Sequence, residues 1–213
     1  MFERDIISQL AAWKTDTNRK PLVVHGARQV GKTWTLKYFG REYFDDVAYF
    51  SLDKDESGLC DVFRTTKDPQ RIIQHLSFLH GKKIEPQTTL LILDEIQECN
   101  EALNALKYFC EEAPEYAVAC AGSLLGIYLN HVGKSFPVGK VNHLYMYPLT
   151  FTEFLRTKDP VMHEYMHSID KVEPLPQIFF DKLRESFTAY SICGGMPEPA
   201  TLMVDFNDME RVD

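Results

Sequence analysis

Short runs of apolar residues recur along the first 147 residues of the chain. Turn residues or polar residues bound each run, and no run is long enough for a typical helix, so the runs predict strands. The five predicted strands cover residues 21–25, 47–52, 89–95, 116–121 and 141–147. The third run is apolar on both faces until it ends in two carboxylates. A strand of this kind belongs inside a parallel sheet that helices cover.

Apolar residues at helical spacing predict amphipathic helices between and after these strands. The predicted helices cover residues 4–13, 34–39, 69–80, 101–112, 151–155 and 178–192. Strands and helices alternate up to residue 147, whereas only helical patterns follow. The sequence therefore predicts an α/β domain over residues 1–147 and a smaller helical lid over residues 148–213, the start of a region that is cut short.

The turn after the first strand carries the sequence's strongest chemical signal. Residues 26–33 read Gly-Ala-Arg-Gln-Val-Gly-Lys-Thr and match the phosphate-binding pattern G-x-x-x-x-G-K-[ST] without a mismatch. Glycines let successive N–H groups curl around a phosphate, and the helix that follows adds its positive N-terminal end. Lys32 would contact the β- and γ-phosphates, and the Thr33 hydroxyl would ligate Mg²⁺. The predicted nucleotide-binding residues are Gly26, Ala27, Arg28, Gln29, Val30, Gly31, Lys32, Thr33 and Trp34.

Two carboxylates end the third strand, Asp94 and Glu95. They would project from the carboxyl edge of the sheet, where α/β proteins bind ligands. Asp94 is predicted to hold the Mg²⁺ shell, and Glu95 to accept a proton from an attacking water as a catalytic residue. The alternative is a solvated acidic strand end that caps the next helix. Gln97 either orients a water or faces solvent, and the sequence does not decide between these roles.

Ser123 ends the fourth strand. In P-loop ATPases that have an extra strand between the phosphate-loop strand and the acidic strand, a polar residue at this end senses the γ-phosphate. Ser123 is therefore predicted as a third catalytic residue beside Lys32 and Glu95. A helix-capping role is an almost equal alternative, because serine is a common cap.

These patterns together predict a three-layer P-loop NTPase fold. Its five-stranded, mainly parallel sheet has the predicted order 5-1-4-3-2, in which strand 1 precedes the phosphate loop and strand 3 ends at Asp94. The helical lid follows the sheet.

Composition narrows the class of protein further. The chain has 213 residues, of which 45% are hydrophobic and 25% charged, as in a globular domain. Its net charge of −8 argues against wholesale, nonspecific nucleic-acid binding. The five cysteines show no C-x-x-C spacing, so we expect reduced cysteines, a cytoplasmic location and no zinc site. We expect no membrane segment, because no apolar run approaches the length of a span.

Five segments in order resemble the prokaryotic AAA-type ATPases that have a nuclease-like carboxyl half. They are the phosphate loop, Leu-Asp-Glu-Ile-Gln at 93–97, Ala-Gly-Ser at 121–123, Pro-Leu-Thr-Phe-Thr-Glu-Phe at 148–154 and Gly-Gly-Met-Pro-Glu at 194–198. The family usually has Gly-Arg before the Pro-Leu-Ser-Phe segment, whereas Gly139-Lys140 stands here. If that arginine stabilises charge on the phosphate, Lys140 would keep the positive charge but lose the planar guanidinium that binds two phosphate oxygens at once. The family's usual length implies that the nuclease-like half is missing.

Together the residues and the resemblance predict Mg²⁺-dependent binding and hydrolysis of ATP that drives a conformational change in attached domains or partners. ATP is expected rather than GTP, because no Asn-Lys-x-Asp motif is present. The partners implied are ATP, a second copy or another protein, and DNA through the missing domain. A nucleotide-gated scaffold with negligible turnover is one alternative. A P-loop kinase is another, disfavoured because Asp94-Glu95 suits water activation and no arginine-rich lid is seen.

Overall fold

The computed structural model describes residues 2–53, 58–122 and 139–205. Within these ranges five strands form one sheet in the order β2-β3-β4-β1-β5. The strands are β1 (Leu22–His25), β2 (Asp46–Ser51), β3 (Thr89–Asp94), β4 (Ala117–Gly122) and β5 (Asn142–Tyr145). Every strand pairing is parallel. The observed sheet confirms the predicted α/β class and the predicted strand order.

Burial along the strands follows their position in the sheet. β3 and β4 have neighbours on both sides, and all of their residues are buried. β5 is an edge strand, and its residues alternate between half-buried and exposed. The all-apolar third run was therefore a sound indicator of an internal parallel strand.

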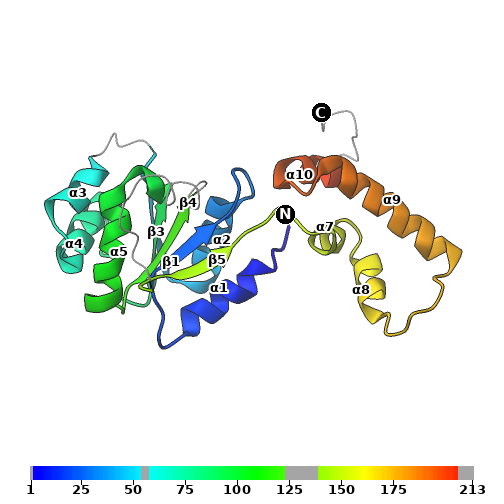
Figure 1. Cartoon of the computed structure of the whole chain (residues 1–213), viewed down its shortest axis with the longest axis horizontal. Coiled ribbons are helices and arrows are strands. Elements are labelled where there is room, and N and C mark those ends of the chain that lie inside the picture. The colour runs from blue at the N-terminus through cyan, green and yellow to red at the C-terminus, as the bar shows by residue number, and fades with distance from the viewer. Residues whose placement is uncertain (1, 54–57, 123–138, 206–213) are drawn as a thin grey trace. The chain divides into compact units, whose positions relative to one another are not determined.

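Helices cover both faces of this sheet. Helices α1 (Ile6–Thr15) and α2 (Lys32–Tyr43) lie on one face, and α3 (Leu59–Thr65), α4 (Pro69–His80) and α5 (Asn100–Glu112) cover the other (Figure 1). On the second face, Leu91 and Leu93 of β3 share a buried cluster with Phe63, Ile72 and Leu106 of the three helices. Alternate residues of the strands enter this cluster because successive side chains point to opposite faces. The sequence pattern did not predict the short helix α3.

Local capping signals explain the sharp ends of α4. The Asp68 carboxylate accepts a hydrogen bond from the N–H of Gln70 at 2.9 Å, and Pro69 occupies the first helical position. Both are favoured at a helix N-terminus. Gly81 ends the helix with φ 76°, a left-handed conformation that glycine adopts without strain. The predicted range 69–80 for this helix is confirmed.

The chain forms two compact units, residues 6–146 and a helical unit made of residues 147–205 together with residues 2–5. The helices of the second unit are α7 (Phe151–Lys158), α8 (Pro160–Ser168), α9 (Gln177–Cys193) and α10 (Pro197–Asp205). Its core consists of Phe2, Leu149, Phe154, Ala189, Cys193, Ala200 and Met203. The sequence-based division placed residues 2–5 in the α/β domain, whereas these residues pack within the helical unit. Neither α8 nor α10 was predicted.

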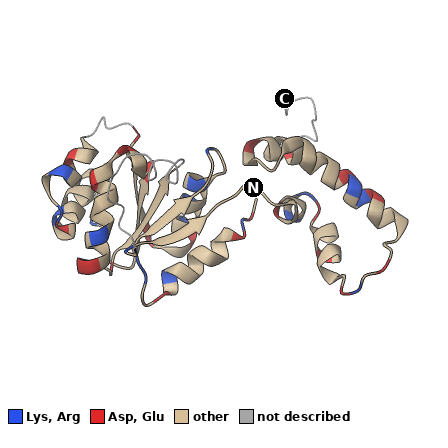
Figure 2. Cartoon of the chain, in the orientation of Figure 1, with Lys and Arg blue, Asp and Glu red and all other residues tan. Residues whose placement is uncertain are grey.

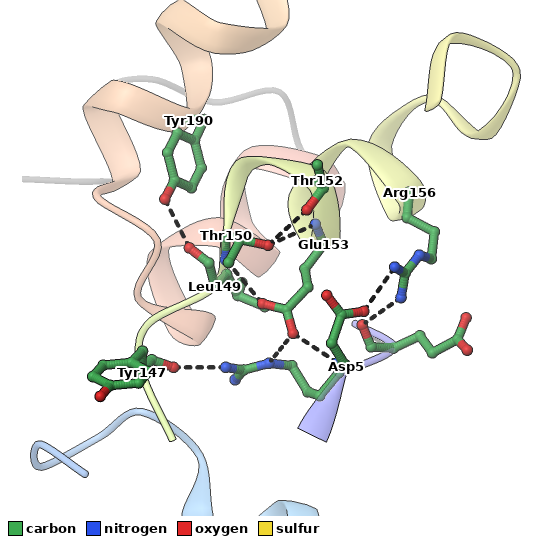
Figure 3. Close-up of polar contacts among 10 residues, drawn as sticks. Asp5, Tyr147, Leu149, Thr150, Thr152, Glu153, Arg156 and Tyr190 are labelled. Atoms are coloured by element: carbon green, nitrogen blue, oxygen red, sulfur yellow. Dashed lines mark hydrogen bonds and ion pairs between the residues drawn. The ribbon is translucent and has the colours of Figure 1, made fainter. Parts of the chain in front are cut away.

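A buried carboxylate joins the chain's amino-terminal residues to α7 (Figure 3). Oε1 of Glu153 accepts hydrogen bonds from Arg4 Nε at 3.1 Å and from the Asp5 N–H at 2.8 Å. Its Oε2 accepts from the Thr150 N–H at 2.8 Å, and the Thr150 hydroxyl accepts from the Glu153 N–H at 3.2 Å. This reciprocal pair is a capping box for α7. The second guanidinium nitrogen of Arg4 donates to the Tyr147 carbonyl at 2.6 Å.

Residues 194–198, another segment that carries the family resemblance, contact the chain just before α7 at Leu149. The Leu149 N–H donates to the Gly195 carbonyl at 2.7 Å. The Tyr190 hydroxyl donates to the Leu149 carbonyl at 2.7 Å (Figure 3). Gly195 has φ 71°, and a Cβ atom there would lie 2.6 Å from the Leu149 carbonyl oxygen. Only glycine fits this approach. Residues 148–154 therefore contribute Leu149 and Phe154 to the core of the helical unit, and residues 194–198 are hydrogen-bonded to them through Gly195.

Candidate functional site

The turn between β1 and α2 depends on two glycines with positive φ. Gly26 has φ 157°, and a Cβ atom on it would lie 2.3 Å from the carbonyl oxygen of Met146. Met146 is held there because its N–H donates to the His25 carbonyl at 2.8 Å, just beyond the β1–β5 pairing. Gly31, with φ 94°, leads directly into α2. The two glycines thus allow the tight curl in which backbone N–H groups can surround a phosphate.

Lys32 is the first residue of α2, and its side chain returns to the loop. Nζ donates to the carbonyl oxygens of Gly26 at 2.9 Å and Ala27 at 2.8 Å. Burial lowers the pKa of Lys32 from its usual value, while the carboxylates of Glu95 and Asp94 act in the opposite direction. The amine therefore lies within the phosphate loop and within electrostatic reach of both carboxylates at the end of β3 (the distribution of charged residues over the chain is drawn in Figure 2).

Asp94 connects the end of β3 to the phosphate loop. It is buried, and its Oδ2 accepts a hydrogen bond from the Thr33 hydroxyl at 2.8 Å. Its Oδ1 accepts from the Glu95 N–H at 3.1 Å. The residues come together because β1 and β3 are parallel strands, whose carboxyl ends lie at the same edge of the sheet.

The oxygen atoms at this point suit Mg²⁺ in a nucleotide complex. The Thr33 hydroxyl donates its hydrogen bond to Asp94, which leaves an oxygen lone pair free to ligate a cation. The described residues contain no group of three His, Cys, Asp or Glu that would hold a metal on their own. Protein-bound Mg²⁺ usually takes only one or two protein ligands and completes its shell with phosphate oxygens and water. Thr33 and Asp94 therefore fit the ion as a pair.

Glu95 is held in an uncommon backbone conformation beside Asp94. Its φ of 50° lies in the left-handed region, which costs a non-glycine residue about 1–3 kcal/mol. Nε2 of Gln97 donates to Glu95 Oε2 at 2.6 Å. Gln97 is 6% exposed, so it does not face solvent, and its buried Oε1 has no hydrogen-bond partner among the residues that the structure describes. Gln97 thus orients the Glu95 carboxylate.

A comparison with known protein families decides how this arrangement is classified. The family described as AAA domain matches residues 18–155, which is more than half of the chain. The chain belongs to the AAA domain family. The matched range takes in the phosphate loop and the acidic end of β3.

Solved structures similar to this AAA domain include two proteins of distant sequence. PCH-2 from C. elegans is 12% identical, with a TM-score of 0.48, and the match covers 96% of this chain and 63% of that one. DnaA from Aquifex aeolicus, bound to AMPPCP, is 14% identical, with a TM-score of 0.38, and the match covers 95% of this chain and 63% of that one. The chain thus spans less than two thirds of either protein.

No curated protein sequence matches this chain. None of the described helices has the length and apolar composition needed to cross a bilayer.

The remaining predicted loop residues of the AAA domain differ in their surroundings. Residues 27–29 are exposed at the tip of the loop, whereas Val30 is fully buried. Gln29 has φ 65°, so this part of the curl is formed without glycine. Trp34 is 42% exposed, and its ring stacks on the ring of Tyr38 one turn along α2, with the ring centroids 5.3 Å apart. Val30 therefore anchors the loop, while residues 27–29 remain accessible to a ligand.

Two further sequence-based expectations concern residues outside the loop. Ser123 lies outside the described residues, and its role stays a prediction. Lys140 is described, and its Nζ pairs with Glu111 Oε1 at 2.9 Å. It precedes β5 and so lies at the amino edge of the parallel sheet, whereas the phosphate loop follows the carboxyl end of β1. Lys140 is therefore not placed to contact a phosphate held by its own loop.

Sequence reasoning missed one residue of the site, Tyr49 on β2. Its hydroxyl donates to Asp94 Oδ2 at 3.0 Å. Burial and the charge of Asp94 raise the pKa of Tyr49 to about 12, so the phenol is a neutral donor at physiological pH. The available signal in the sequence was weak. Tyr49 lies in a strand predicted to neighbour the strand that ends at Asp94, and a tyrosine in such a strand most often serves only for packing.

Proposed function

We propose that this chain binds ATP with Mg²⁺ and hydrolyses it. The observation that carries the proposal is the 2.8 Å hydrogen bond between Thr33 and Asp94, which joins the phosphate loop to the acidic end of β3. Either segment alone has ordinary structural explanations. Together they supply the phosphate contacts, the metal ligands and a base that hydrolysis of a nucleoside triphosphate requires.

In this proposal each residue of the site has a separate task. The loop N–H groups and Lys32 hold the phosphates, and Thr33 and Asp94 hold Mg²⁺, which neutralises developing charge on the phosphate oxygens. Glu95 accepts the proton of the attacking water, and Gln97 keeps its carboxylate oriented through their 2.6 Å hydrogen bond. Ser123 is proposed as the residue that senses the γ-phosphate.

The wider proposals concern the rest of the protein. We infer that residues 1–147 act as the ATPase domain and residues 148–213 as a helical lid whose movement transmits nucleotide hydrolysis to attached domains. The resemblance supports assignment to the prokaryotic AAA-type ATPases with a nuclease-like carboxyl half. Under that assignment the partners are a second copy or another protein, and DNA through the further domain. Lys140 lies at the other edge of the sheet and cannot reach a phosphate held by its own loop. A second copy would therefore also supply the cation that stabilises the transition state.

A nucleotide-gated scaffold with negligible turnover is the second candidate function. Fast phosphoryl transfer typically needs an added cation near the phosphate. Lys140 is paired with Glu111 away from the phosphate loop, so it does not supply that cation, and this favours a scaffold with low turnover. Release of inorganic phosphate from ATP, measured with and without acceptor molecules, separates the candidates. Phosphate release without an acceptor identifies a hydrolase, whereas turnover of ATP only with an acceptor identifies a kinase. Tight binding without release identifies the scaffold.

Replacing Lys32 with alanine is expected to weaken ATP·Mg²⁺ binding tenfold or more. The reason is that a charge-assisted contact to phosphate contributes about 1.5–3 kcal/mol. Isothermal titration calorimetry measures the effect, and Lys82→Ala serves as the control because that lysine is exposed on the turn after α4. Equal affinities of the two variants would remove the loop from the proposed function.

A further inference from the structure

Three donors surround the carboxylate of Asp94, and one of them has no role in the function proposed so far. Thr33 and Tyr49 both donate to Oδ2, at 2.8 Å and 3.0 Å, and the Glu95 N–H donates to Oδ1 at 3.1 Å. Asp94 itself is only 5% exposed. A buried carboxylate with this many donors has little freedom to rotate. Tyr49 is the donor that comes from a separate strand.

The position of Tyr49 follows from the register of β2 against β3. Ser51 lies opposite Asp94, and Tyr49 lies opposite Ile92, two residues earlier on the same face. A long aromatic side chain at such a diagonal position can reach along the strand to its neighbour. The phenol oxygen therefore meets Asp94 without any departure from regular pairing.

Helix α2 holds the tyrosine from the other side. Nζ of Lys37 lies 3.3 Å from the centroid of the Tyr49 ring, a cation–π contact. Lys37 is four residues after Thr33, one turn along the same helix face. Thr33 thus contacts Asp94, Asp94 contacts Tyr49, and Tyr49 contacts Lys37, which lies on the same helix as Thr33. This set of contacts links the Thr33 hydroxyl to the orientation of the tyrosine.

We propose that Tyr49 is the positioning residue of the metal site: its hydroxyl fixes Asp94 so that Oδ2 accepts the hydrogen bond of the Thr33 hydroxyl and the Thr33 oxygen faces the cation. The inference rests on the proposed binding of nucleotide with Mg²⁺. Without the phenol hydroxyl, the carboxylate can turn about its Cβ–Cγ bond, and the Thr33 hydroxyl loses its fixed direction. Tyr49 contacts neither the phosphates nor the metal in this scheme.

The test is Tyr49→Phe, which keeps the ring beneath Lys37 and removes only the hydroxyl. Calorimetry gives the affinity for a non-hydrolysable ATP analogue with excess MgCl₂ and with EDTA, and the ratio of the two affinities is the gain due to metal. We expect Tyr49→Phe to lower this ratio about tenfold, as for loss of one hydrogen bond to a charged acceptor, and to leave the EDTA affinity unchanged. Tyr116→Phe is the matched control, since that hydroxyl lies 3.4 Å from Gln70 on the surface.

A double-mutant cycle with Asp94→Asn provides the second measurement. In the Asp94→Asn background, Tyr49→Phe should cause no further loss of the metal-dependent gain, because both changes disrupt one arrangement. Additive losses would overturn the inference, as would an unchanged ratio in Tyr49→Phe or an equal loss of affinity with and without metal. If the unaltered chain binds no analogue, or binds it without a gain from Mg²⁺, the proposed function itself fails and the inference fails with it.

Discussion

Replacing Glu95 with glutamine is expected to leave ATP binding intact and to slow hydrolysis by about 10²–10⁴-fold, the usual contribution of a general base. Glutamine keeps the shape of the side chain, and its amide oxygen can still accept the hydrogen bond from Gln97. Only the ability to take a proton from water is lost. Phosphate release at saturating ATP measures the rate, and calorimetry on the same preparation measures the affinity.

Glu98→Gln is the matched control for this variant, because Glu98 is exposed three residues further on. It should hydrolyse ATP at the parent rate. If Glu95→Gln also retains that rate, Glu95 is not the base. Gln97 then becomes the next residue to test, since its buried Oε1 has no hydrogen-bond partner within the described part of the chain.

Replacing Arg4 with methionine is expected to lower the free energy of unfolding of the helical unit by about 3–5 kcal/mol. The side chains of Arg4 and Glu153 are only 7% and 5% exposed, so the substitution leaves a buried carboxylate without its cation. The two tryptophans, Trp13 and Trp34, both lie in the unit of residues 6–146. Urea titration should therefore show early loss of helical circular dichroism, while the tryptophan fluorescence transition stays near its original midpoint.

Arg156→Met is the control for this experiment. Arg156 pairs with Asp5 at 2.8 Å, but the two side chains are 27% and 54% exposed. An exposed pair contributes at most about 1 kcal/mol, so this variant should unfold almost as the parent does. Equal effects of Arg4→Met and Arg156→Met would show that burial of the Arg4–Glu153 pair does not stabilise the unit.

Local patterns in the sequence were sufficient for the sheet and for the centre of the site. A strand between two others in a helix-covered sheet must be apolar on both faces, so Leu90 to Leu93 could be assigned to the interior from their apolar character alone. Gly26 was predictable because the motif requires glycine there, and the space beside the Met146 carbonyl indeed admits no Cβ atom. Asp159 and Pro160 also form a helix-start signal, and Val161, Met162, Tyr165 and Met166 follow at helical spacing. The short helix α8 was nevertheless not predicted, because residues 158–176 are rich in proline, histidine and acidic residues.

Long-range contacts were decided only by the tertiary structure. Tyr49 meets Asp94 across 45 positions, and Arg4 meets Glu153 across 149, separations over which hydrophobic periodicity carries no information. The same holds for Lys140, whose charge the sequence shows but whose place at the amino edge follows from the parallel direction of β5. Motif and periodicity thus determined the five strands, the longer helices and the loop that is expected to bind phosphate, but not the short helices α3, α8 and α10. The tertiary fold determined which side chains orient Asp94 and Glu95, because those contacts depend on strand register and on the packing of α2.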